Sequence, residues 1–263
     1  MRETAPGIAV VPTLIANAYL VGEAASWVLV DACTPGNEGR IRHAAERRFG
    51  PGSRPRAILL THCHFDHAGS AGPLADAWGV PIYAHRLELP YLTGQRSYPP
   101  FNFSEPGFFT RIARFFPTST VNLGTRVLAL ELEKAGESAC PSPEPQGAIP
   151  GLPDWEIIET PGHTPGHVAF FRRGDAALLA GDALTTMNLD SFWDTIARRK
   201  QVCRPPVPAT IDWNDARRSV ELLAGLRPAL IAAGHGAPMR DAAGGLSRLA
   251  KEFRPPNFDW EGH

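Results

Sequence analysis

Four short strand-like runs in this chain each end in side chains of the types that bind metal ions. AILL at 57–60 leads into THCHFDH, and EIIE at 156–159 leads into TPGH. ALLA at 177–180 leads into GD, and LIAA at 230–233 leads into GH. Short apolar runs bounded by turn residues predict buried strands, and the loops that follow strands are where functional side chains are usually placed. The pattern predicts a sheet-based fold with one polar site at the edge of the sheet.

The rest of the chain alternates similar strand-like runs with a few amphipathic helices. Helices are predicted over 37–49, 68–79, 212–226 and 241–253, with Asp212 as the N-cap of the third. Strands dominate both halves of the chain and helices lie between them, which favours a layered α/β sandwich over a helical bundle. No boundary between domains is visible, so residues 1–263 are predicted to form a single domain.

Two segments interrupt this pattern. Residues 134–150 are rich in Pro, Ser and Gly and are predicted to form a flexible loop. Residues 87–122 are irregular, with one short helix expected, and their aromatic side chains are Tyr91, Tyr98, Phe101, Phe103, Phe108, Phe109, Phe115 and Phe116. Two hypotheses stay open for this second segment: it covers an apolar substrate pocket, or it forms the interface of a homodimer. The candidate pocket residues are His85, Tyr91, Tyr98, Phe101, Met187, Phe192 and Trp193.

Composition and charge argue against several classes of function. The formal net charge is -1 and no basic tract is present, so nucleic acid is not expected as a partner. No apolar run approaches the ~20 residues of a membrane span, and no secretory signal is visible. The four cysteines are scattered without CxxC spacing, which is typical of a reducing compartment. These features predict a cytoplasmic protein that acts on a small molecule.

The first cluster of candidate donors, THCHFDH at 61–67, has a spacing that can serve two metal ions. If residues 62–64 are extended, His62 and His64 point to the same side, because side chains alternate along a strand. Asp66 and His67 follow after a turn and can face a neighbouring position. The remote motifs supply further donors of the right type, and the carboxylate of Asp182 has two oxygens with which to bridge. We therefore assign His62, His64 and His163 to one metal ion, Asp66, His67 and His235 to a second, and Asp182 to both.

Neighbouring residues of similar type receive structural roles. His167 opens the strand-like run after His163 and is expected to be structural or to support the ligands. Cys63 lies between two ligands, but alternation turns it away from them and toward the core. Gly162, Gly181 and Gly234 precede three of the sites and allow the backbone to turn sharply or to come close to the donors.

The set of residues resembles the signature of the metallo-β-lactamase superfamily. That signature is H-x-H-x-D-H followed by separated His, Asp and His, and here it runs in family order from His62 to His235. The resemblance covers nearly the whole chain and implies a four-layer αββα sandwich. It also implies that Asp31, which ends the run VLVD, supports the site from behind.

Nitrogen and oxygen donors without a thiolate favour two zinc ions, with iron and manganese as alternatives. Two such ions ~3.5–4 Å apart can share a water molecule and lower its pKa toward ~7. They can also polarise a carbonyl and stabilise the oxyanion that develops on it. Asp66 is the candidate for proton transfer to the leaving group, and Asp182 for holding both ions.

This sequence differs from known enzyme classes of the family, and the differences narrow the range of expected substrates. Glyoxalase II enzymes carry a helical C-terminal domain, whereas this chain ends soon after His235. Acyl-homoserine lactonases place a tyrosine soon after the bridging aspartate, whereas ALTTM follows Asp182 here. We predict a dinuclear metallohydrolase acting on a small ester, lactone or thioester. The alternatives are a mononuclear iron enzyme of the sulfur dioxygenase type and a non-catalytic scaffold with the same fold.

Overall fold

The computed structural model describes residues 1–103, 107–117, 119–130 and 149–254, and its centre is a pair of sheets. The first sheet has strand order β1-β2-β3-β4-β5-β6-β7; β1 to β4 pair antiparallel, and β4 to β7 pair parallel. Its strands are β1 (Arg2–Ala5), β2 (Ile8–Pro12), β3 (Asn17–Glu23), β4 (Ser26–Val30), β5 (Ile58–Leu59), β6 (Ile82–Ala84) and β7 (Val127–Ala129).

The second sheet places the ends of three strands at one edge. Its strands, in sheet order, are β14 (Met239–Arg240), β13 (Leu230–Ala233), β10 (Ala177–Gly181), β9 (Val168–Arg172) and β8 (Glu156–Glu159). β10 pairs parallel with β13, and β9 runs antiparallel to both β8 and β10. The carboxyl ends of β8, β10 and β13 therefore lie at the same edge of the sheet. A separate hairpin joins β11 (Thr185–Met187) and β12 (Lys200–Cys203).

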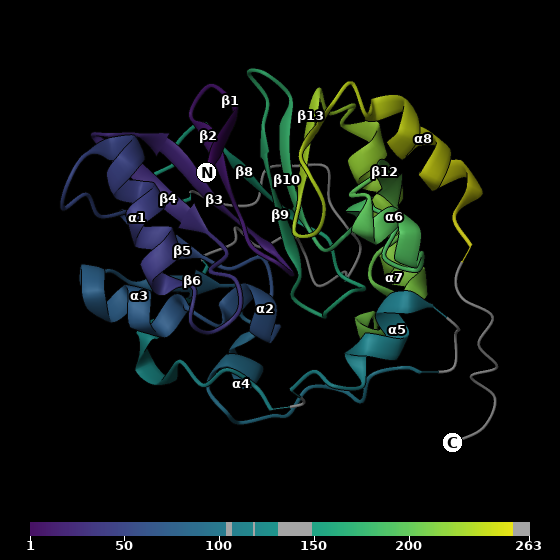
Figure 1. Ribbon diagram of the computed structural model, residues 1–263, viewed down its shortest axis with the longest axis horizontal. Coiled ribbons are helices and arrows are strands. Elements are labelled where there is room, and N and C mark those ends of the chain that lie inside the picture. Colours follow the sequence, from purple (N-terminus) through teal and green to yellow (C-terminus); the bar gives the residue numbers. More distant parts are fainter. Residues whose placement is uncertain (104–106, 118, 131–148, 255–263) are drawn as a thin grey trace.

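Helices cover the outer face of each sheet (Figure 1). The first sheet is covered by α1 (Glu38–Phe49) and α3 (Ala71–Trp78), and the second by α7 (Trp213–Gly225) and α8 (Ala243–Glu252). The order of layers is helix, sheet, sheet, helix. This arrangement confirms the predicted αββα sandwich.

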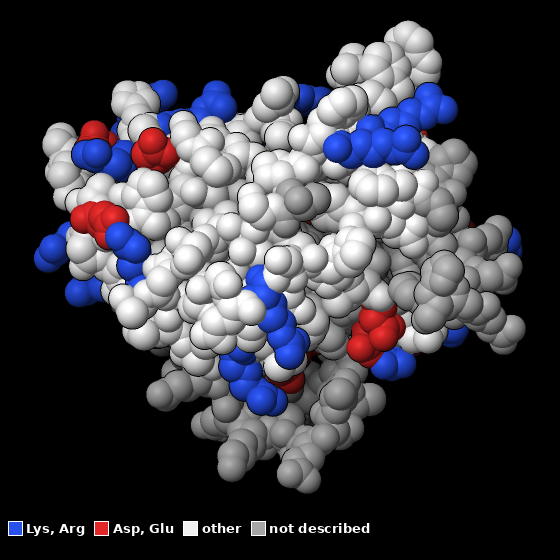
Figure 2. All heavy atoms as spheres, turned by 90° about the horizontal axis from the view of Figure 1, so that it is seen from below, with Lys and Arg blue, Asp and Glu red and all other residues white. Residues whose placement is uncertain are grey.

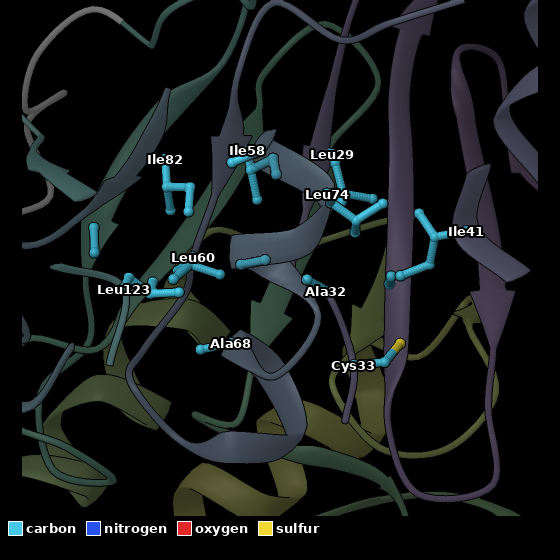
Figure 3. Packing of buried hydrophobic residues seen from close by; sticks show 14 of the residues in the cluster. Leu29, Ala32, Cys33, Ile41, Ile58, Leu60, Ala68, Leu74, Ile82 and Leu123 are labelled. Carbon is cyan, nitrogen blue, oxygen red and sulfur yellow. The ribbon is translucent and has the colours of Figure 1, made fainter. Parts of the chain in front are cut away.

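Alternation along the strands builds the separate cores between these layers. In β4, Leu29 faces the helical layer and packs in the same cluster as Ile58, Ile82 and Leu74 (Figure 3). Its neighbours Val28 and Val30 face the other sheet and join a cluster that contains residues of β8, β9, β10 and β13. Successive side chains point to opposite faces of a strand, so β4 is buried on both sides.

The predicted helices are confirmed, and the side chain of Asp212 caps α7 by accepting the backbone N–H groups of Asn214 and Asp215. The described residues of the segment 87–122 form two short helices where one was expected, α4 (Leu89–Leu92) and α5 (Phe108–Ala113). The loop predicted over 134–150 lies outside the described residues up to residue 148. Among the described residues, no helix is both long and apolar enough to cross a membrane.

Candidate metal centre

The donors come together because four loops meet where the two sheets adjoin. The loop after β5 carries the first cluster, and the loops after β8, β10 and β13 carry His163, Asp182 and His235. His64 is extended (φ -61°, ψ 149°), and helix α2 (Phe65–Ala68) starts directly after it. This turn sends Asp66 and His67 to a different position from that of the two preceding histidines.

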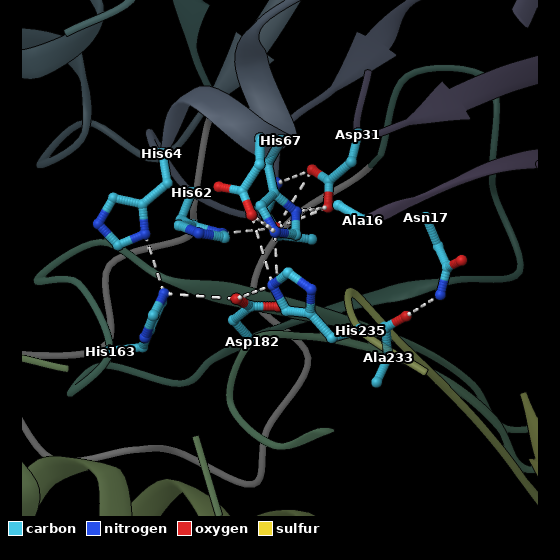
Figure 4. Close-up of polar contacts among 12 residues, drawn as sticks. Ala16, Asn17, Asp31, His62, His64, His67, His163, Asp182, Ala233 and His235 are labelled. Atoms are coloured by element: carbon cyan, nitrogen blue, oxygen red, sulfur yellow. Dashed lines mark hydrogen bonds and ion pairs between the residues drawn. The ribbon is translucent and has the colours of Figure 1, made fainter. Parts of the chain in front are cut away.

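The seven donors form three overlapping groups, and within each group the ligand atoms all lie within 4.8 Å of one another. One group is His62, His64 and His163; a second is Asp66, His67 and His235; the third joins His62 and His67 through Asp182. Each of these side chains is buried, with at most 7% of its residue surface exposed. The structure thus brings all seven candidate ligands into one centre (Figure 4).

Asp182 lies between the first two groups. Its Oδ2 is 3.0 Å from Nε2 of His235 and 3.6 Å from Nε2 of His163, and its Oδ1 is 3.5 Å from Nε2 of His67. Oδ2 of Asp66 also approaches Nε2 of His235, at 3.5 Å. The carboxylate of Asp182 can therefore serve donors of both groups at once.

Three buried atoms of this centre have no hydrogen-bond partner among the described residues: Nε2 of His62, Nε2 of His67 and Oδ1 of Asp182. A buried polar atom without a partner costs about 1–3 kcal/mol, so three in one place need a compensating ligand. All are nitrogen or oxygen atoms close to further donors, which is the donor chemistry of divalent metal ions. The residues present fit a metal centre.

The histidines are oriented by bonds on their opposite ring nitrogens. Nδ1 of His67 donates to Oδ2 of Asp31 at 2.8 Å, and Nδ1 of His235 donates to the Ile15 carbonyl at 2.8 Å. Nδ1 of His163 lies 3.1 Å from the hydroxyl of Thr210, which itself donates to a carbonyl and so accepts from the ring. Such bonds fix the tautomer and leave Nε2 free to bind a metal. His64 differs in the nitrogen that it presents to the other donors: its Nδ1 faces Nε2 of His163, at 3.0 Å.

Residues of the first sheet form hydrogen bonds with the loop that carries His235 in the second sheet. The side chain of Asn17 donates to the carbonyl of Ala233 (Figure 4). It also donates to the carbonyl of Gly236, and the Tyr19 hydroxyl donates to the Ala233 carbonyl. The backbone N–H of Asn17 donates to the carbonyl of Gly234 as well. A donor from the second sheet is therefore placed by strand β3 of the first.

Burial and charge divide the histidines into two kinds. Burial, together with neighbouring histidines, holds the pKa values of His62 and His163 well below the ordinary range. Burial also opposes the charging of His67 and His235, but the neighbouring carboxylates, Asp182 first, outweigh it and raise both pKa values. Burial acts to raise the pKa of Asp182, but the two histidines beside it hold that pKa well below its usual value. Without metal, the rings of His67 and His235 therefore keep a proton to a higher pH than those of His62 and His163.

A narrow cavity of about 20 Å³ opens on the donors. Beside His64, Asp66, His163, Asp182 and His235, it is lined by Phe65, Phe101, Phe109, Ala113, Phe116, Pro206, Pro208 and Ala209. Helix α5 supplies part of this apolar wall, and the ring of Phe109 lies 6.1 Å from the ring of His235. None of the described residues that line the cavity is a Lys or an Arg.

The residues predicted for the pocket are distributed differently. Phe101 lies in the wall, and Tyr98 packs its ring edge-on against His64, with centroids 5.3 Å apart. Tyr91 belongs to the core under the first sheet, and His85 is buried against Glu159. Met187, Phe192 and Trp193 do not line the cavity, and the last is 77% exposed.

Part of the cavity wall has no clear signal in the sequence. Phe109 and Phe116 stand out only as aromatic residues of 87–122, and nothing in the sequence points to residues 206–209. Those four residues follow β12 and include a short 3₁₀ helix, Val207–Ala209. Only the folded chain brings them next to α5.

Comparisons with known proteins point to one family. The family model described as the metallo-beta-lactamase superfamily matches residues 11–235. The probable metallo-hydrolase YflN of Bacillus subtilis (strain 168) is 38% identical over 241 residues, covering 90% of this chain and 86% of that protein.

Solved structures show the same fold. TTHA1429, a metallo-beta-lactamase family protein from Thermus thermophilus, is 25% identical with a TM-score of 0.60, covering 94% of this chain and 79% of that one. TTHA1623, crystallised in a di-iron-bound form, is 28% identical with a TM-score of 0.57, covering 92% and 96%. The matched family model spans every donor from His62 to His235. The chain belongs to the metallo-β-lactamase superfamily.

Proposed function

We propose that this protein is a dinuclear metal-dependent hydrolase that cleaves a small, uncharged ester, lactone or thioester. The observation that carries the proposal is the set of three buried, unpartnered donor atoms at the meeting point of two ligand groups in the described part of the chain. Zinc is our first choice of metal because the donors are imidazoles and carboxylates. Similarity to a protein crystallised in a di-iron-bound form supports two-ion occupancy and keeps iron as an alternative.

Two divalent ions, when bound, supply a hydroxide nucleophile at neutral pH and polarise the carbonyl that it attacks. The chain supplies the remaining functions. Asp182 faces donors of both groups, so its carboxylate holds them in a fixed relation. Asp66 lines the cavity and is the carboxylate placed to carry a proton to the leaving oxygen or sulfur.

The wall of the cavity supports an uncharged substrate. Away from the metal donors, the described lining residues are phenylalanine, proline and alanine without a Lys or Arg, so this part of the wall offers no partner to a carboxylate or phosphate of the substrate. Burying an unpaired charge in such a place is costly. The aromatic rings in this wall favour an apolar acyl group. Phe101, Phe109 and Phe116 would contact the acyl group.

The charge distribution on one face of the molecule supports a small-molecule substrate. Seen from below, Lys and Arg side chains stand in separate groups, several of them beside Asp or Glu, without a continuous basic surface in the described part of that face (Figure 2). Binding to a nucleic-acid backbone depends on clustered Lys and Arg.

The decisive experiment combines metal analysis with a substrate panel. We expect purified protein reconstituted with zinc to hold two metal ions per chain and to hydrolyse uncharged aryl esters, lactones or thioesters faster than phosphodiesters or β-lactams. Removal of metal with a chelator should abolish turnover, and added metal should restore it. Full activity without metal would contradict the proposal, whereas oxygen-dependent turnover with one iron per chain would favour the dioxygenase alternative.

A further inference from the structure

Glu88 is a fully buried carboxylate near the metal centre that is not one of its donors. It immediately precedes α4, and its residue surface is 0% exposed. No Lys or Arg among the described residues forms an ion pair with it. A buried carboxylate without a cation must be stabilised by hydrogen bonds, so its partners show what it holds.

The two oxygens of Glu88 accept hydrogen bonds from two different metal-binding loops. Oε2 accepts the backbone N–H of Cys63 at 2.8 Å, and Oε1 accepts the backbone N–H of Gly166 at 2.7 Å. Cys63 stands between His62 and His64, and Gly166 is three residues beyond His163. One carboxylate therefore joins the backbone segments that present all three histidines of the first group.

Gly166 is the residue that allows this approach. A Cβ atom there would lie 2.9 Å from Oε1 of Glu88 and 2.5 Å from Nδ1 of His85, closer than real Cβ contacts allow. Cys63 is held on its other side as well, because the Tyr98 hydroxyl donates to its carbonyl at 2.7 Å. Both holding side chains come from the segment 87–122.

We propose that Glu88 is a positioning residue that fixes the separation between the His62–His64 loop and the His163 loop, and so determines the geometry of the first metal group. The inference rests on the proposed metal centre. Hydrogen bonds from backbone N–H groups to an ionised carboxylate are shorter and stronger than neutral ones, and their loss lets the two loops move independently. The second group takes Asp66 and His67 from the same loop, but His67 is held separately, by Asp31 at its Nδ1 and by the backbone N–H of Ala32 at its carbonyl, so the geometry of that group should be unaffected.

Two background variants, each with only one of the two ligand groups intact, separate a positioning role of Glu88 from a general effect on folding. His235→Ala removes a donor of the second group, and His163→Ala removes one of the first. In each background, cobalt or zinc affinity is measured by competition with a chelator, without substrate. Glu88→Gln keeps the size of the side chain but presents an NH₂ donor to one of the two N–H groups. Glu159→Gln is the matched control, because Glu159 bonds to the ring of His85 and both loop amides bond to Glu88 instead.

We expect Glu88→Gln to weaken metal binding ~10–100-fold in the His235→Ala background, as for other residues that orient metal ligands. Affinity in the His163→Ala background, and in both backgrounds carrying Glu159→Gln, should be unchanged within error. Glu88→Asp keeps the charge but reaches only one loop, so its loss should be intermediate and confined to the first group. Cobalt absorption spectra should change in the same background only.

Equal losses in both backgrounds, or no loss in either, would overturn the positioning role. If Glu88→Gln does not fold, the same comparison with Glu88→Asp decides the question. Absence of metal binding in the unmodified protein would instead overturn the proposed function, so the two failures are distinguishable.

Discussion

His167 accepts a hydrogen bond from the backbone N–H of Asp182 through its Nε2, at 2.9 Å. Its Nδ1 must then carry the proton, which it donates to the Thr160 hydroxyl at 2.7 Å. Burial lowers the pKa of His167 to about 3, so the ring is neutral at physiological pH and keeps this tautomer. His167 therefore holds the backbone of Asp182, the aspartate that lies between the two ligand groups.

Replacing His167 by Phe should weaken the centre without removing a ligand. The two rings are similar in size, but the N–H of Asp182 loses its acceptor, which costs about 1–3 kcal/mol in unfolding free energy. Metal affinity should fall ~10–100-fold. Urea unfolding of the metal-free protein and chelator competition measure the two effects. The exposed His43→Gln serves as control, and unchanged metal affinity in the Phe variant would contradict the supporting role.

Asp182→Asn should remove the carboxylate that faces both groups while keeping the shape of the side chain. The amide loses the negative charge that now attracts His67 and His235. We expect metal content to fall and turnover to drop to that of the metal-free protein, measured by elemental analysis and steady-state assays. Asp175→Asn, on the surface beside Arg172, should leave both unchanged. Full metal content in Asp182→Asn would rule out a bridging carboxylate.

Metal binding should release protons and weaken as the pH falls. The raised pKa values of His67 and His235 mean that both rings hold protons above the ordinary pKa of ~6.5. A metal ligand must be neutral imidazole, so the ion displaces these protons. Where both are protonated, the logarithm of the affinity should fall by about two for each unit by which the pH is lowered. Calorimetric titration in buffers of different ionisation enthalpy counts the protons, and a count of zero would refute this view of the centre.

Gly234→Ala should damage the centre directly. A Cβ at this position would overlap Oδ1 of Asp182 and Cε1 of His67, so both side chains must move. Overpacking of this kind costs about 1–3 kcal/mol, and we expect the variant to bind metal poorly while staying folded. Gly174→Ala is the matched control, since a Cβ there meets nothing within 4 Å. Circular dichroism and metal analysis together test the expectation, which fails if both variants bind metal equally well.

Phe109→Ala should reduce activity on substrates with apolar acyl groups. Phe109 lines the cavity, and loss of a buried aromatic contact of about 1.5–3 kcal/mol corresponds to ~10–100-fold in kcat/KM. Phe115→Ala, at a side chain 88% exposed, is the control. Steady-state kinetics on a series of esters of increasing acyl length should show the largest loss for the most apolar member. An equal loss for every ester would contradict acyl binding at this wall.

The layers and the donor set could be predicted from the sequence because both depend on local pattern. Apolar runs and the Asp212 cap mark elements, and the donors directly follow strands. The pocket could not be predicted in this way. Phe192 lies near Asp182 in sequence, yet it packs against Phe108 outside the cavity lining and is 45% exposed. Glu88 has no motif, because its role arises only when two distant loops meet.

Other expectations depend on properties beyond a single folded chain. The cytoplasmic location, the homodimer through residues 87–122 and the single-domain assignment remain predictions. Location and assembly are determined by the cell and by other molecules as much as by local sequence pattern. The identity of the metal is also a prediction, since imidazole and carboxylate donors suit several divalent ions.

The first ligand group draws His62 and His64 from the loop after β5 in one sheet and His163 from the loop after β8 in the other. An ion in that group fastens the amino-terminal half of the chain to the carboxyl-terminal half. Separating the halves then requires releasing the ion, so the free energy of unfolding rises with the logarithm of free metal concentration. The supply of metal in a cell would thus set the lifetime of the protein as well as its activity.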